Sequence, residues 1–142
     1  MNRRDIAEAF LAAVNKFDLD AASMYCTDNF TYSGPFPQPV SMQEWKAASA
    51  LFLNAFPDWQ FNMRLEHDHG DMMHISAQIT GTHHGDLDLS SLGMQVIPAT
   101  HRVIRLAPVM GELTFEGDKV ANLHIHVVDG AGIPAIVAQL TA

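Results

Sequence analysis

Residues 41–66 read SMQEWKAASALFLNAFPDWQFNMRLE, and the pattern of apolar side chains changes at Pro57. Before the proline, apolar residues recur at spacings of three and four, which is typical of one face of a helix; they are Trp45, Ala48, Leu51, Phe52, Ala55 and Phe56. Ser41 and Glu44 form the Ser-x-x-Glu pattern of a capping box, so we expect the helix to begin there. After Pro57, apolar and polar residues alternate, as in a strand with one buried face; the apolar ones are Trp59, Phe61, Met63 and Leu65.

Helical spacing also occurs upstream of this stretch, over residues 6–17 and 18–25, while strand-like patterns follow it. The expected strands are 27–33, 59–66, 73–80, 102–115 (bent near Pro108 and Gly111) and 120–128. Residues 85–93 are expected to be a polar connection, and residues 133–140 leave helix and irregular chain both open. Helices followed by hairpin-linked strands predict one α+β domain over residues 1–142, with an antiparallel sheet curled around the helices.

The composition excludes several classes of protein. The chain has 142 residues, with 8 Lys and Arg against 16 Asp and Glu and a formal net charge of −8. No basic cluster is present, so nucleic acid and anionic membranes are not expected partners. Cys26 is the only cysteine, which excludes an intramolecular disulfide. Charged residues interrupt the N-terminal apolar pattern and no apolar run reaches the length of a membrane span, so we expect a cytoplasmic protein.

Short motifs that occur in order along the chain resemble the SnoaL-like polyketide cyclase family, within the superfamily named for nuclear transport factor two. The motifs are Phe56-Pro57-Asp58, Gly81-Thr82-His83-His84-Gly85, Thr100-His101-Arg102-Val103, Phe115-Glu116-Gly117-Asp118-Lys119-Val120 and the ending from Val128-Asp129 to Gln139-Leu140. The resemblance covers residues 6–140 and implies a cone-shaped, cystatin-like barrel, in which a curved antiparallel sheet packs around the N-terminal helices. It also implies a homodimer.

The resemblance implies an enzyme that needs no metal or cofactor. Cyclases of this family close a ring by an intramolecular aldol-type reaction, in which a base removes a proton beside a carbonyl and donors stabilise the enolate. The family's acid/base aspartate corresponds to Asp129, with His126, Asn54 or Tyr32 orienting a small apolar or carbonyl-containing substrate. Two other readings stay open: Asp129 as a strand-ending turn residue, and Asn54 as an exposed residue at a helix end.

The substrate-binding residues expected in the pocket are Tyr32, Phe56, Trp59, His83, Met110 and His124. One stretch departs from the family pattern, because residues 123–126 (LHIH) replace the usual tryptophan or glutamate before the final aspartate. The first hypothesis is therefore a cofactor-free cyclase or isomerase, a lyase-type activity. The alternative is a non-catalytic module, on the same fold, that binds an apolar ligand or dimerises.

Histidine is abundant, with eight residues in the chain. His67-x-His69 and His124-x-His126 each place two imidazoles on one face of a strand, a pattern that suits a metal if two such pairs are neighbours. We expect surface or pocket-rim histidines instead, and no metal site. Alternation also places His124 and His126 opposite to Ile125, Val127 and Asp129. Unless a bulge intervenes, Asp129 and the histidine pair cannot share one pocket.

Overall fold

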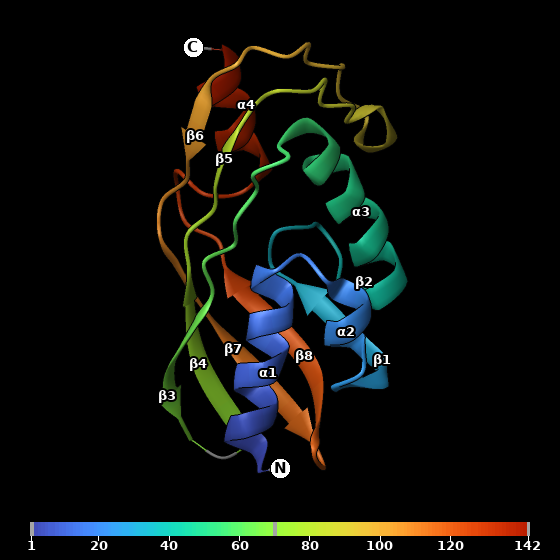
Figure 1. Ribbon diagram of the computed structural model, residues 1–142, viewed down its shortest axis with the longest axis vertical. Helices are drawn as coiled ribbons and strands as arrows, with labels where there is room; N and C mark the ends of the chain where they lie inside the picture. The colour runs from blue at the N-terminus through green and yellow to red at the C-terminus, as the bar shows by residue number, and fades with distance from the viewer. Residues whose placement is uncertain (1, 70, 142) are drawn as a thin grey trace.

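The structure, a computed structural model, describes residues 2–69 and 71–141 (Figure 1). Its helices are α1 (Arg3–Asn15), α2 (Leu19–Ser23), α3 (Met42–Ala55) and α4 (Ile133–Thr141), with a 3₁₀ turn at Ser90–Leu92. Its strands are β1 (Cys26–Ser33), β2 (Val40–Ser41), β3 (Arg64–Asp68), β4 (Met72–Ala77), β5 (Thr80–Thr82), β6 (Val103–Arg105), β7 (Val109–Glu116) and β8 (Lys119–His126). The α+β class expected from the sequence is confirmed.

Six strands form one curved sheet in the order β2-β1-β8-β7-β4-β3, and β5 and β6 form a separate two-stranded ribbon. The expectation of a purely antiparallel sheet is wrong at one place, because β1 and β8 are parallel. Parallel neighbours cannot be joined by a hairpin. Here the chain between them, residues 34–118, makes the crossover and contributes α3 and strands β2 to β7.

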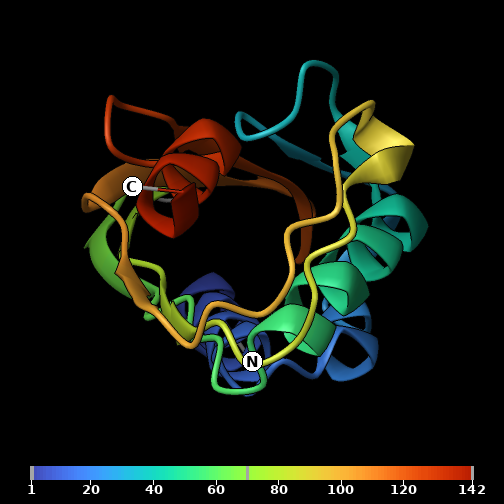
Figure 2. The ribbon, with the colours of Figure 1, turned by 90° about the horizontal axis from the view of Figure 1, so that it is seen from above.

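The helices cover the inner side of the curved sheet. Figure 1 shows α1 lying across β4, β7 and β8, with α3 on the far side of the interior and α4 above it. Seen from above in Figure 2, the sheet, α3 and α4 surround a common interior. The capping box of α3 is present: the Glu44 N–H donates to Ser41 Oγ at 3.2 Å, and the Ser41 N–H donates to Glu44 Oε1 at 3.0 Å.

The alternating stretch after Pro57 forms less strand than its pattern predicts. Only Arg64–Asp68 joins the sheet, while Gln60 makes an isolated bridge to Thr80. Asn62 has a positive φ of 51°, which interrupts an extended chain. The side chain of Asn15 in α1 bonds both the N–H and the C=O of Met63, each at 2.8 Å. A contact to a helix therefore replaces the ladder bonds of a strand at this point.

Three other expected elements differ in detail. The strand predicted over 102–115 divides into β6 and β7, because Pro108 has no N–H and β6 pairs with β5 outside the main sheet. The strand predicted over 73–80 ends at Ala77. The polar connection over 85–93 contains two fully buried residues, Leu87 and Leu89. Residues 133–140, for which the sequence did not decide between helix and irregular chain, belong to helix α4.

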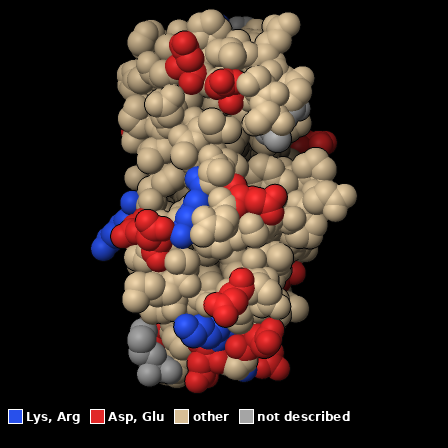
Figure 3. Space-filling view, turned by 90° about the vertical axis from the view of Figure 1, so that its right-hand side faces the viewer, with Lys and Arg blue, Asp and Glu red and all other residues tan. Residues whose placement is uncertain are grey.

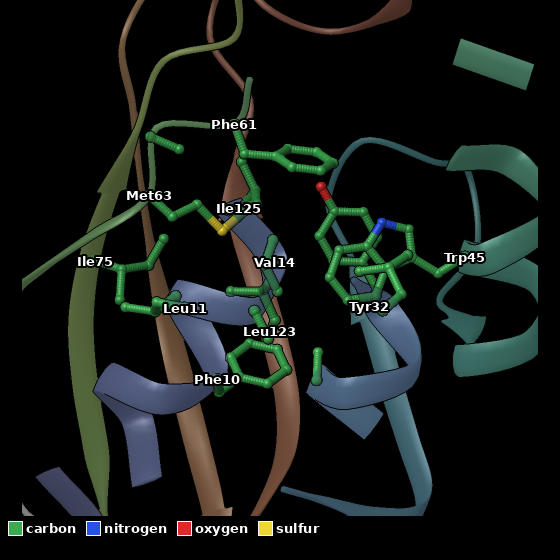
Figure 4. Packing of buried hydrophobic residues seen from close by; sticks show 14 of the residues in the cluster. Phe10, Leu11, Val14, Tyr32, Trp45, Phe61, Met63, Ile75, Leu123 and Ile125 are labelled. Atoms are coloured by element: carbon green, nitrogen blue, oxygen red, sulfur yellow. The ribbon is translucent and has the colours of Figure 1, made fainter. Parts of the chain in front are cut away.

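The core lies between the sheet and the helices, and Figure 4 shows part of it. Tyr32 stacks on Trp45 with ring centroids 4.4 Å apart, and Trp45 stacks on Phe30 at 6.0 Å. On the face in Figure 3, basic side chains are few and lie beside acidic ones. Among the described residues, no helix is long and apolar enough to cross a membrane.

Candidate functional site

A cavity of about 70 Å³ lies inside the fold, bounded by the inner face of the sheet and by α3 and α4. Much of its wall is aromatic; the aromatic residues that line it are Phe17, Tyr32, Phe36, Trp45, Phe52, Trp59 and Phe61. A volume of 10–15 Å³ on this scale holds one water, so the cavity has room for a ligand fragment of several atoms without rearrangement.

Each wall of the cavity follows from a local pattern in the chain. Alternation along β8 and its continuation turns Ile125 and Val127 inward. Helix α4 contributes Ile133 and Ile136 from one side of its first turn. Gly34 lies so close to β8 that a Cβ would stand 2.0 Å from the carbonyl oxygen of Ile125. Glycine at this position therefore brings the following residues, including Phe36, against the cavity.

None of the described residues that line the cavity is Asp, Glu, Lys, Arg or His. Its polar side-chain groups among the described residues are the hydroxyls of Tyr32 and Ser49 and the indole N–H groups of Trp45 and Trp59. Burial raises the pKa of Tyr32 well above its ordinary value, so its hydroxyl keeps its proton at neutral pH. The Trp59 Nε1–H is buried with no hydrogen-bond partner among the described residues. Such a wall suits a neutral, mainly apolar molecule.

The family model described as SnoaL-like polyketide cyclase matches residues 4–136. The chain belongs to this family. The resemblance found in the sequence motifs is therefore confirmed over most of the length of this SnoaL-like protein.

Solved structures share the fold of this SnoaL-like protein at low sequence identity. AclR, a proposed hydroxylase from Streptomyces galilaeus, is 20% identical, with a TM-score of 0.72 over 99% of this chain and 82% of its own. A proposed polyketide cyclase from Pseudomonas putida is 14% identical, with a TM-score of 0.73 over 98% of each chain. IdmH, a proposed polyketide cyclase from Streptomyces antibioticus, is 16% identical, with a TM-score of 0.70 over 100% of each chain. A comparison with curated protein sequences finds no match.

Of the site residues expected from the sequence, Tyr32 and Trp59 line the cavity. Phe56 is fully buried behind them, packed on Trp59 with ring centroids 5.6 Å apart. His83 is one layer further out, fully buried and stacked on Phe56 at 5.2 Å. Neither Phe56 nor His83 belongs to the wall, so neither contacts a ligand in the cavity directly.

His83 is held as a neutral imidazole. Its Nδ1 accepts the backbone N–H of Thr100 at 3.1 Å, so the ring hydrogen is on Nε2. Burial lowers the pKa of His83, with a smaller opposing effect from Asp86. The Nε2 atom makes no hydrogen bond of good geometry among the described residues, although a contact with the backbone of Ile97 has a small opposing effect on the pKa. His83 therefore supports the wall through Phe56 and stays uncharged.

Met110, His124 and His126 lie on the outer face of the sheet, away from the cavity. His124 Nδ1 is 2.7 Å from Ser33 Oγ, and His126 Nε2 bonds the carboxylate of Glu112. The register pairs His126 with Met110 and His124 with Glu112, with no shift between them. The predicted separation of this histidine pair from Ile125 and Val127 is therefore confirmed, and the pair does not face a ligand in the cavity.

Asp129 and Asn54 are both exposed, and neither belongs to the cavity wall. The expectation that Asp129 shares the face of Ile125 and Val127 is wrong, because β8 ends at His126 and the alternation does not continue as far as residue 129. Gly130 and Gly132, with φ of 84° and 88°, then turn the chain. Asp129 borders a separate, open hollow beside the outer side of α4 instead.

The other histidines do not gather into a ligand set. His67, His69 and His74 lie together, with ring centroids 5.1–6.4 Å apart. Across residues 2–69 and 71–141, no three His, Cys, Asp or Glu side chains are arranged to hold a metal ion.

Sequence reasoning missed most of the cavity wall. Alternation placed Ile125 and Val127 opposite the histidine pair, and the same pattern along β7 could have identified Val109. The contributions of α1 and α4 have no comparable signal; they are Phe17 just after α1, and Ile133 and Ile136 in α4. Which helix face meets the open part of the interior depends on how the helices pack.

Proposed function

We propose that this SnoaL-like protein binds a small, mainly apolar molecule in the cavity between the sheet, α3 and α4. The proposal rests on one observation: a cavity with an aromatic and aliphatic wall that carries no charged side chain. Pockets of this kind, with a few polar groups among apolar ones, are typical ligand sites. A homodimer is part of the proposal, and light scattering on the purified protein tests it separately.

Binding in the cavity is tested by filling it. Ala48 on α3 lines the cavity, while Ala47 on the same helix is exposed. The probe is indane, a compact hydrocarbon, and the measurement is the melting temperature with and without it. We expect indane to raise the melting temperature of the wild type and of Ala47→Leu but not of Ala48→Leu. An equal rise in Ala48→Leu would place the binding elsewhere.

A second candidate function is a cofactor-free, aldol-type cyclisation or isomerisation in the same cavity. Membership in the polyketide cyclase family favours it, together with the Tyr32 hydroxyl, the one proton-bearing group with an altered pKa in the wall. It ranks second because the described residues of the wall include no carboxylate or imidazole that could serve as the base.

Proton abstraction beside a carbonyl can be measured directly as exchange of the C2 hydrogens of 1-indanone in D₂O by NMR. A catalyst should exceed the buffer rate, and Tyr32→Phe should remove the excess if the Tyr32 hydroxyl stabilises the enolate. If Asp129→Asn lost the exchange rate above that of the buffer, Asp129 would be the base. A wild-type rate equal to the buffer rate would contradict this second function while leaving binding intact.

A further inference from the structure

The wall of the cavity reaches the surface of the protein at Val127. Among the described residues that line the cavity, Val127 alone is exposed, at 42%, while the others are buried or half-buried. A side chain that borders the cavity and also contacts water leaves no second layer of residues over the cavity at that point. The wall between the cavity and the solvent is therefore one side chain thick at Val127.

The space on the solvent side of Val127 is the open hollow beside α4. Val127 and Ala131 border both the cavity and this hollow, so the two spaces meet at these side chains. The hollow has a volume of about 530 Å³, which is large enough to admit a small molecule. A path from solvent through the hollow to the cavity is therefore interrupted at Val127 and Ala131 only.

The chain at Val127 is no longer held by the sheet. The pairing of β8 with β7 ends at His126 and Met110, so Val127 is the first residue beyond it. A Cβ at Gly132 would stand 3.1 Å from Cγ1 of Val127, so the valine side chain closes against a glycine that has no side chain to interlock with it. Val127 can therefore move away from Gly132 without breaking the pairing of β8, and such local opening costs little free energy in an exposed loop.

We propose that Val127 is the gate of the cavity: its side chain, closed against Gly132, blocks a passage from the hollow beside α4, and the ligand enters and leaves when this side chain moves aside. The inference rests on the proposed binding function and adds the route of ligand exchange to it. A gate lowers the association rate constant, because only the open form admits the ligand. A residue that merely contacts the bound ligand changes mainly the dissociation rate constant.

The test measures both rate constants for 5-fluoroindane from the line shapes of its ¹⁹F NMR signal during titration with the protein. Val127→Ala shortens the side chain that closes the passage. Val128→Ala is the matched control, because Val128 is 49% exposed and borders the hollow but not the cavity. Phe36→Ala examines a rival entrance at residues 34–39, where Phe36 lines the cavity and is half-buried.

We expect Val127→Ala to raise the association rate constant by about 5–10-fold, within the range that variants of one binding site span. Val128→Ala should associate as the wild type does, and Phe36→Ala should change mainly the dissociation rate constant. An equal rise in Val128→Ala would contradict a gate at Val127, and a rise in Phe36→Ala alone would place the entrance at residues 34–39.

Two further outcomes separate the gate from the binding function. If 5-fluoroindane binds and Val127→Ala associates no faster than the wild type, or if the wild type already associates at the diffusion limit, the gate is wrong and the binding function stands. If 5-fluoroindane does not bind the wild type, the binding function fails and the inference with it.

Discussion

The two faces of β8 carry opposite kinds of side chain. On the inner face, Leu123 is fully buried and Ile125 lines the cavity. On the outer face, His124 and His126 are hydrogen-bonded to Ser33 and Glu112. The imidazoles of this strand thus lie on its outer face, while the cavity lies on the face where none of the described lining residues is ionised.

The largest expected effect is a difference in stability between a substitution on the inner face of β8 and one on its outer face. Leu123→Ala should lower the free energy of unfolding by about 2–5 kcal/mol, because it opens a void in a close-packed core. His124→Ala is the matched control one residue along the strand. It removes one hydrogen bond at a partly exposed site and should change stability by about 1 kcal/mol. Urea denaturation measures both, and equal losses would contradict the assignment of faces.

A smaller effect is the pH dependence of stability, to which the buried His83 should contribute and the exposed histidines should not. The pKa of His83 is lowered in the folded state, so the unfolded chain binds the proton more readily. This contribution to stability is present above the ordinary histidine pKa, near 6.5, and is lost as pH falls through the lowered folded value. The urea concentration at the unfolding midpoint of the wild type should therefore decrease as the pH is lowered below 6.5.

Two variants check this pH dependence. His83→Gln should flatten the fall in the urea midpoint, because it removes the group that titrates differently in the two states. His126→Gln, an exposed control, should keep the fall. If the urea midpoint of His83→Gln decreases with pH as steeply as that of the wild type, other groups cause the pH dependence.

The smallest expected effect concerns the pair of His126 and Glu112. The His126 side chain is 55% exposed, and exposed ion pairs contribute little because solvent screens them. His126→Ala should change the free energy of unfolding by no more than about 1 kcal/mol. It should also leave the affinity for indane unchanged, whereas a loss of binding would place this residue in contact with the ligand.

The features that the sequence predicted correctly are those set by residues close together in the chain. The capping box at Ser41 and Glu44 gave the start of α3, and alternation gave the two faces of β8 up to Val127. Ordered motifs gave the family, and with it the fold. Each of these features depends on residues close together in the chain.

The failures involve contacts that join distant residues. The strand after Pro57 is interrupted because Asn15, 48 positions away from Met63, takes its backbone bonds. Asp129 entered the candidate site by resemblance, although β8 ends three residues earlier at a loop with two positive-φ glycines. Neither the reach of Asn15 nor the path of that loop can be worked out from periodicity.

The position of the two tryptophans has a practical consequence. The chain has two tryptophans, Trp45 and Trp59, and both line the cavity. All indole emission of the protein therefore originates at the cavity wall. A ligand that enters should shift or quench this intrinsic fluorescence, so the unlabelled protein carries its own optical reporter for screening compounds.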